Sequence, residues 1–70
     1  MKVGDVVMFT DQGRYAKWFY GRIGVITHMS KNKASGQDHC RVQWVTEPVE
    51  YHDRMTSYSD FPLAYFEILI

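Results

Sequence analysis

Residues 18–26 read Trp-Phe-Tyr-Gly-Arg-Ile-Gly-Val-Ile, and this stretch decides the fold. Aromatic and β-branched residues favour the pleated, half-buried surface of a strand, and glycine lets the backbone turn sharply or approach another strand closely. Gly21 and Gly24 follow three consecutive rings and open an apolar run. The stretch therefore predicts a chain that leaves a loop, turns a corner and enters a central strand.

Working outward from this corner, the same pattern predicts strands within residues 1–10, over 23–29, over 39–45, over 54–57 and over 66–70. The clearest is 39–45, where Cys40, Val42 and Trp44 alternate with polar residues, as in a strand with one buried face. Residues 59–62, Ser-Asp-Phe-Pro, have the pattern of a helix start, with room for about one turn before the last strand.

Two segments lack an apolar period and are expected to be loops. Residues 11–20 form a long first loop that is rich in basic and aromatic side chains, and residues 30–38 are polar and are expected to be exposed and mobile. Short strands around one long loop predict an all-β fold. We expect residues 1–70 to form a single domain, a small SH3-like barrel of about five strands with one short 3-10 turn before the last strand.

Composition limits the classes of protein to which the chain can belong. An apolar fraction of 46% and 16% aromatic residues exclude a disordered chain. The net charge is zero, with an excess of four basic residues in positions 1–35 and of four acidic residues in positions 36–70. A single cysteine, Cys40, excludes an internal disulfide, and no apolar run has the length of a membrane span or a signal peptide. We expect a protein of the reducing cytoplasm without membrane contact.

Several short motifs resemble the SH3-like barrels of electron-transport accessory proteins. The opening Lys-Val-Gly-Asp-Val-Val, the aromatic loop that leads into Ile-Gly-Val-Ile, the strand Cys-Arg-Val-Gln-Trp and the ending Phe-Glu-Ile carry this resemblance. This group includes the photosystem I reaction-centre subunit IV, the variable chain of ferredoxin–thioredoxin reductase and the barrel domain of nitrile hydratase β subunits. The resemblance implies a non-catalytic docking piece for a partner protein. Residues 30–38 and 47–53 depart from the pattern.

Two further resemblances cover less of the chain. Gly4-Asp5-Val6-Val7, Gly21 and Gly24-Val25-Ile26 resemble the KOW motif, which implies an SH3-like barrel that binds RNA or a polymerase. The Lys-Val-Gly-Asp start and the Phe-Glu-Ile end also resemble small uncharacterised proteins of marine bacteriophages, which implies a host cytoplasm as the compartment.

The aromatic loop and the tyrosines near it are the main candidate binding site. Alternate residues of a small barrel face outward, so either Trp18 and Tyr20 or Phe19 alone is expected to be exposed, and exposed rings are frequent in protein interfaces. The alternative is a loop that folds back so that its rings close the barrel end. The predicted partner-binding residues are Arg14, Tyr15, Lys17, Trp18, Tyr20, Tyr51 and Tyr58.

Basic residues alternate with these rings in the sequence, and this pattern is also compatible with a second function, the binding of nucleic acid. A groove for single-stranded RNA or DNA would pair the phosphates with basic groups and stack the bases on the rings. The alternative is an ordinary solvated surface, because the total charge is balanced. The basic residues in question are Arg14, Lys17, Arg22, Lys31 and Lys33.

No pattern of catalytic or metal-ligating residues is present in the sequence. His28, His39 and His52 are 11 and 13 residues apart, which matches no close-paired ligand signature. His39 and Cys40 are adjacent and point to opposite faces of a regular strand, so the two side chains cannot form a catalytic pair or share one ion. We expect neither an enzyme nor a cofactor. A second copy of the chain is a candidate partner, because so small a core gains by burying an aromatic face.

Overall fold

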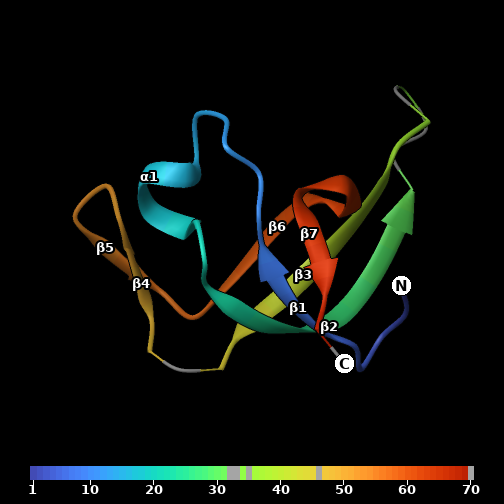
Figure 1. Cartoon of the computed structure of the whole chain (residues 1–70), viewed down its shortest axis with the longest axis horizontal. Helices are drawn as coiled ribbons and strands as arrows, with labels where there is room; N and C mark the ends of the chain where they lie inside the picture. The colour runs from blue at the N-terminus through green and yellow to red at the C-terminus, as the bar shows by residue number, and fades with distance from the viewer. Residues whose placement is uncertain (32–33, 35, 46, 70) are drawn as a thin grey trace.

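The computed structural model describes residues 1–31, 34, 36–45 and 47–69. Its main feature is a five-stranded antiparallel sheet in the order β6-β3-β2-β1-β7, beside a two-stranded sheet, β4-β5 (Figure 1). The strands are β1 (Val6–Phe9), β2 (Ile23–Lys31), β3 (Asp38–Trp44), β4 (Val49–Tyr51), β5 (Arg54–Thr56), β6 (Tyr58–Pro62) and β7 (Phe66–Ile68). A one-turn helix, α1 (Ala16–Phe19), and a 3-10 turn, η1 (Leu63–Tyr65), complete the fold.

The prediction of a small all-β domain with one short 3-10 turn before the last strand is confirmed. The described chain has seven strands where about five were expected, because β4 and β6 were not predicted; β4 pairs with the predicted strand β5 in a separate hairpin. Within the segment expected to be a loop over 30–38, β2 continues through Lys31 and β3 begins at Asp38; residues 32, 33 and 35 lie outside the described residues.

The predicted helix start over residues 59–62 is wrong, because this segment is most of β6. Ser59 pairs with Val42 and Phe61 with Cys40 across the ladder to β3, and Phe61 is buried. The pairing and burial outweigh the local capping pattern, and Pro62 is tolerated at the end of an edge strand, where its missing N–H costs no ladder bond. The helical turn begins one residue later, at Leu63.

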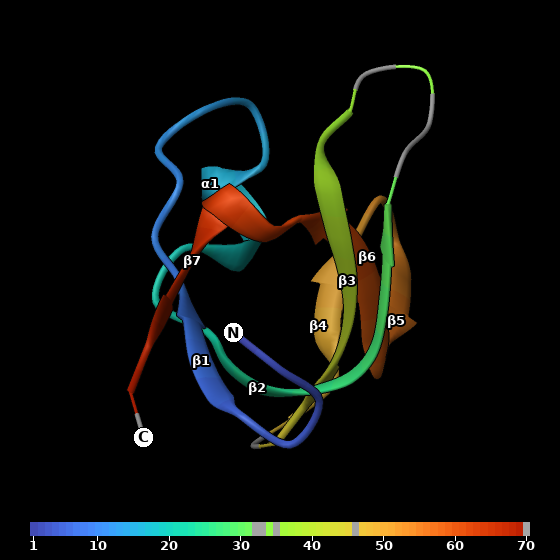
Figure 2. The ribbon, with the colours of Figure 1, turned by 90° about the vertical axis from the view of Figure 1, so that its right-hand side faces the viewer.

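Strand β2 bends strongly and pairs with β1 on one side and with β3 on the other. Figure 2 shows it running beside β1 on one side and then beside β3 on the other. The register with β3 shifts between Ile26 and His28, a bulge that increases local bending. A Cβ atom at Gly24 would lie 3.0 Å from the carbonyl oxygen of Gln43 and 3.3 Å from Cε3 of Trp44. A larger residue would have to displace β3 by a few tenths of an ångström, so glycine favours the close packing of these strands that the sequence predicted.

The core lies inside the curve of this sheet. Alternate residues of β1 and β3 point into it, including Val7, Phe9, Cys40, Val42 and Trp44. All four phenylalanines of the chain are buried, with at most 6% of each exposed, whereas none of the five tyrosines is buried. Among the described residues the core holds no buried polar or charged residue.

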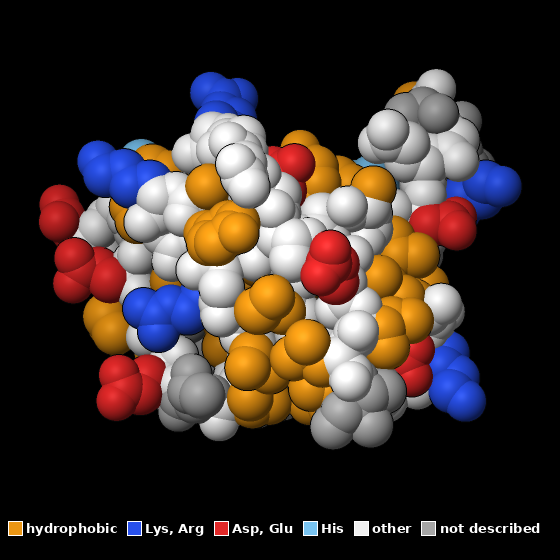
Figure 3. All heavy atoms as spheres, viewed as in Figure 1, with side chains coloured by type: hydrophobic (Ala, Val, Ile, Leu, Met, Phe, Trp, Pro, Cys, Tyr) orange, Lys and Arg blue, Asp and Glu red, His pale blue; other side chains and the backbone are white. Residues whose placement is uncertain are grey.

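The outer face of β1 and β2 is also apolar, which the sequence reading did not identify. Met8 pairs with Ile23 and Val6 with Val25, and all four side chains point away from the core and are half-buried. Figure 3 shows hydrophobic side chains gathered over this part of the sheet. The signal in the sequence is the unbroken apolar run of β1, since strands with one solvated face usually alternate.

Candidate docking surface

The long first loop is ordered by short-range hydrogen bonds. The Asp11 carboxylate accepts a hydrogen bond from the Gly13 amide at 3.0 Å, and the Gly13 carbonyl accepts one from the Ala16 amide at 3.1 Å. These turns start α1, a single helical turn that we had expected to be irregular loop. The loop therefore presents its side chains from a defined backbone.

Phe19 anchors the loop in the core. Its ring lies 5.8 Å from that of Phe9, 5.0 Å from that of Phe61 and 5.5 Å from that of Trp44 (centroid distances), and only 2% of the residue is exposed. The loop thus folds back on the barrel: Phe19 points into the core, and Tyr15 and Trp18 pack against the core from its edge. Tyr20 is 53% exposed, and Trp18 is half-buried.

Helix α1 lies beside the hairpin of β4 and β5, which is far from it in sequence (Figure 1). Trp18 of α1 packs against this hairpin. Its ring centroid lies 4.9 Å from that of Tyr51, nearly perpendicular at 86°, and 4.9 Å from that of His52. His52 and Asp53 form the hairpin turn with φ values of 50° and 62°, the left-handed backbone of a two-residue hairpin. The sequence pattern singles out His52 only as a candidate metal ligand, whereas its contact with Trp18 gives it a packing role.

Tyr15 and two cations complete this group of rings. The Tyr15 ring lies 6.2 Å from that of Tyr51. The guanidinium of Arg14 lies 5.8 Å from the centre of the Tyr15 ring, and the ammonium of Lys17 lies 5.4 Å from the Trp18 ring. Both cations are within the range of cation–π attraction. Five of the seven predicted residues, from Arg14 to Trp18 and Tyr51, are thus brought together.

Of the other two predicted residues, Tyr20 belongs to the same loop, where it follows α1, and Tyr58 lies apart on β6. Tyr20 is exposed, and no ring contact joins it to another described aromatic residue. Tyr58 is 54% exposed on β6, and the guanidinium of Arg41 lies 5.0 Å from its ring centre. We therefore define the aromatic docking surface as Arg14, Tyr15, Lys17, Trp18, Tyr20 and Tyr51, without Tyr58.

A groove of about 560 Å³ begins where this surface ends. Tyr15 and Tyr51 form one side of it, and β6 and η1 form the other. The residues on the β6 and η1 side are Ser59, Asp60, Phe61, Pro62 and Tyr65. Sequence reasoning missed this wall, because it assigned residues 59–62 to a helix start.

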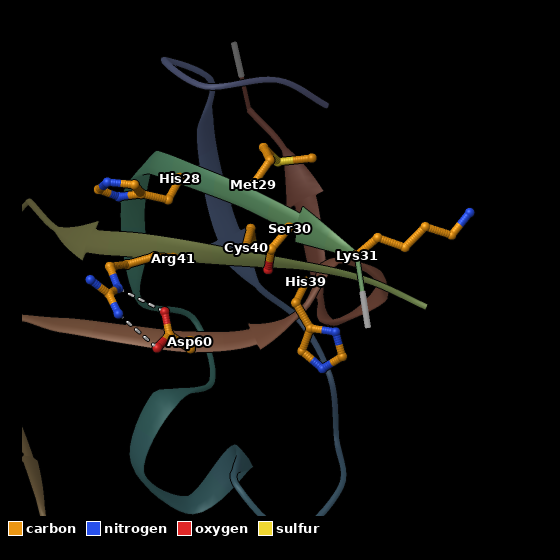
Figure 4. A pocket seen from close by; sticks show the side chains of 8 residues that line it. All are labelled: His28, Met29, Ser30, Lys31, His39, Cys40, Arg41 and Asp60. Carbon is orange, nitrogen blue, oxygen red and sulfur yellow. Dashed lines mark hydrogen bonds and ion pairs between the residues drawn. The ribbon is translucent and has the colours of Figure 1, made fainter. Parts of the chain in front are cut away.

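A second hollow, of about 530 Å³, is lined by residues of β2, β3 and β6, six of them with polar side chains and two, Met29 and Cys40, with apolar ones (Figure 4). Across it, Nε of Arg41 donates to Oδ1 of Asp60 at 2.8 Å and Nη2 donates to Oδ2 at 3.2 Å. This hydrogen bonding lowers the pKa of the Asp60 carboxyl and raises that of the Arg41 guanidinium. The pair fixes β6 against β3 on a surface of mixed charge.

The single thiol is an unreactive part of the core. Cys40 is 2% exposed on the inner face of β3, and His39 projects from the opposite face. Burial, together with the nearby Asp60 charge, raises the pKa of the Cys40 thiol to about 11. A thiol that stays protonated is a poor nucleophile and a poor metal ligand.

The three histidines and the basic residues do not gather at one place. His28 and His39 border the polar hollow, whereas His52 packs on Trp18. No group of three or more His, Cys, Asp or Glu in the described ranges has the arrangement of a metal site. Of the five basic candidates, Arg14 and Lys17 lie on the docking surface, Arg22 and Lys31 lie at opposite ends of β2, and Lys33 lies outside the described residues.

Comparison with known proteins gives no relative for this chain. No family model, no curated protein and no solved structure matches it. Within the described residues, no helix is long and apolar enough to cross a membrane. Any functional assignment therefore depends on the chemistry of the surfaces described above.

Proposed function

We propose that this protein is a non-catalytic docking module that binds a partner protein through the aromatic docking surface. The observation that carries the proposal is the group formed by Tyr15, Trp18 and Tyr51. These large rings are held against each other at the edge of the core, against which they pack, and they keep part of their area in contact with water. Rings of this kind bury much apolar area at little entropic cost, and they dominate the energetics of protein interfaces.

The arrangement of the strands supports a docking role of the SH3-like kind. The five-stranded sheet returns its last strand, β7, to the first, β1, after a short 3-10 turn, which is the connection expected for such a barrel. The loop that carries Arg14, Lys17 and Trp18 leaves this sheet between β1 and β2, so the rigid sheet positions a binding loop.

Partner capture by three forms of the protein tests the proposal. The tagged protein, the double variant Trp18→Ala/Tyr20→Ala and the control Tyr58→Ala are each exposed to an extract of the native host, and retained proteins are identified by mass spectrometry. Tyr58 is a matched control because it is as exposed as Tyr20 but lies outside the docking surface. We expect a partner retained by the native protein and by Tyr58→Ala to be lost by the double variant.

Thermal unfolding of the same proteins is the necessary companion measurement. The double variant should still melt cooperatively, because Phe19 keeps the loop anchored in the core. Equal capture by all three proteins would contradict the assignment. A double variant that no longer folds would show that Trp18 is part of the core.

A second candidate function is binding of single-stranded RNA or DNA. The observation that favours it is the pairing of a cation with a ring at two places, Arg14 with Tyr15 and Lys17 with Trp18. Two phosphate contacts predict a slope of about −1.4 for the logarithm of the binding constant against the logarithm of the salt concentration. Fluorescence anisotropy with a labelled oligonucleotide measures this slope, and a flat titration at low salt excludes the function.

A further inference from the structure

The outer face of the five-stranded sheet carries a regular array of side chains from four neighbouring strands. At its centre Met8 pairs with Ile23 and Val6 pairs with Val25, and these side chains point away from the core. Residues in β3 or β7, or directly after them, continue both rows across the ladders to β2 and β1. We call this array the outer apolar face; its two rows are Val45-Ile23-Met8-Glu67 and Gln43-Val25-Val6-Leu69.

Six of these eight side chains are apolar, and they remain partly in contact with water. Val45 is 50% exposed and Leu69 is 44% exposed, at opposite margins of the face, whereas the four central side chains are half-buried. No second layer of the described chain covers them, although an apolar sheet face normally packs against another element. A continuous apolar face of this kind marks an interaction site. Between β2 and β3 it is hollowed over about 400 Å³, lined by Val25, Thr27, Gln43, Trp44 and Val45.

The charges on the face restrict what can cover it. Glu67 is its single charged side chain, and none of its eight residues is a lysine or an arginine. Nucleic acids and anionic membranes bind to apolar or aromatic surfaces that are flanked by basic groups, so they do not fit this face. The partner proposed above binds elsewhere, at the loop that carries Trp18 and at β4. The face requires an occupant that is itself a nearly uncharged apolar surface of similar size.

A second copy of the chain offers this surface, and the two copies fit by a two-fold rotation. Two sheets with the same twist pack face to face about 10 Å apart, with their strands within about 30° of each other. An axis that runs along the strands between β1 and β2 places β7 of each copy over β3 of the other. Leu69 then lies over the hollow between β2 and β3 of the second copy. Such a contact uses the same residues twice and closes after two copies.

The same rotation gives Glu67 a partner. Glu67 lies at the β7 margin, so the rotation brings it to Val45 and Gln43 at the β3 margin of the second copy. Within the described residues the Gln43 side chain makes no hydrogen bond, and its amide can donate to a carboxylate. The two Glu67 carboxylates lie at opposite margins of the contact, so like charges do not meet.

The size of the outer apolar face sets the strength of the contact. With strands about 4.8 Å apart and rows about 6.7 Å apart, the array covers about 250 Å². The residues around it raise the area to roughly 500 Å² per copy, or roughly 1,000 Å² in total, which is the lower limit for a specific interface. A small interface leaves little surplus after the cost of association, so we expect a dissociation constant of about 10 µM to 1 mM.

We propose that the protein forms a weak, symmetric dimer in which the outer apolar faces of two copies pack against each other. This dimer goes beyond the proposed docking function and does not depend on it. It leaves both aromatic docking surfaces free, because α1 and β4 lie outside the contact. A partner with two binding segments would be held at both surfaces, and the second contact would add affinity through its high effective concentration.

Sedimentation equilibrium of the full chain tests the dimer. Runs at protein concentrations from about 10 µM to about 1 mM cover the expected range of affinity. We expect the weight-average mass to rise over this range from that of one chain toward that of two. A mass that stays at that of one chain at every concentration would overturn the proposal.

Charge changes at Val45 test the arrangement of the two copies. Val45 is half exposed, so Val45→Lys and Val45→Glu should both still fold, and thermal melts check this. Val45→Lys places a cation beside Glu67 of the second copy and should lower the dissociation constant about 2- to 10-fold, whereas Val45→Glu should raise it by a similar factor. If both variants weaken the dimer equally, or if neither changes it, the proposed dimer is wrong.

Two control variants show whether the copies meet through another surface. Met55→Glu is the matched control, because Met55 is 62% exposed on β5, outside the outer apolar face. Met55→Glu and Trp18→Ala/Tyr20→Ala should both leave the dissociation constant of the dimer unchanged. A dimer that is weakened by either control but not by Val45→Glu would contradict the assignment of the interface.

Discussion

The phenylalanines and the tyrosines of this chain occupy different parts of the molecule. Phe9, Phe19, Phe61 and Phe66 are buried with at most 6% exposed, while every tyrosine is half-buried or exposed. The two side chains differ by one hydroxyl group. Because the described core contains no buried polar residue, it has no side-chain partner for that hydroxyl, and an unpaired buried hydroxyl is costly. The hydroxyl thus separates rings that hold the fold from rings that can meet a partner.

The largest effect should come from removing a core ring. Phe9 is fully buried and contacts the rings of Phe19, Phe61, Tyr65 and Phe66. Phe9→Ala should cost about 3–5 kcal/mol of unfolding free energy, measured by urea denaturation.

Phe9→Tyr tests the comparison directly, because it adds only the hydroxyl. We expect a loss of about 1–3 kcal/mol, the cost of an unsatisfied buried polar group. If Phe9→Tyr were as stable as the native protein, the hydroxyl would not be what separates the two groups of rings.

A ring on the docking surface should matter less than a core ring. Trp18 is half-buried and contacts Tyr51 and His52. Trp18→Ala should therefore lower the free energy of unfolding by about 1–2 kcal/mol. The variant loses roughly half the buried apolar area of a core ring, and it loses one aromatic contact. Urea denaturation measures this loss, and Tyr20→Ala serves as its control, because a change at an exposed position usually stays within about 0.5 kcal/mol. A loss at Trp18 as large as that at Phe9 would place Trp18 in the core.

The smallest effect concerns the exposed pair beside Tyr58. Arg41 lowers the pKa of Asp60, so the pair stabilises the fold at neutral pH, and this contribution is lost as the pH falls below the ordinary carboxyl pKa. Asp60→Asn should be slightly less stable than the native protein at pH 7, and the difference should vanish in acid. Thermal melts from about pH 2 to about pH 7, on both sides of the ordinary carboxyl pKa of about 4, measure this difference in stability. A difference that grows in acid would contradict the assignment.

Much of the fold follows from local pattern. The alternation of Cys40, Val42 and Trp44 predicted β3, and the run from Ile23 predicted β2 with its close approach at Gly24, because period and backbone freedom are local properties. Residues 59–62 were assigned wrongly because their ladder to β3 lies some twenty residues away in sequence. The pattern of neighbouring residues does not predict pairing between strands that are far apart in sequence.

The candidate site was predicted less completely. The loop rings and Tyr51 were identified, but which of Trp18, Phe19 and Tyr20 points inward depends on the one turn of α1. The structure places Tyr58 apart from these rings, on β6 next to Arg41, and this position depends on strand pairing, which the local pattern does not show. Tyr65 was overlooked for the same reason, since only the fold brings η1 beside the loop.

The buried thiol of β3 makes it possible to measure how often the folded protein opens. Cys40 is 2% exposed and its thiol has a pKa of about 11, so a thiol reagent at mildly alkaline pH reacts only with molecules in which β3 has separated from its neighbours. The labelling rate relative to that of the denatured chain gives the fraction of open molecules at each instant. A partner that binds only the folded protein lowers this fraction and therefore slows the labelling. The labelling rate of this one thiol therefore reports how often β3 opens, with and without a bound partner.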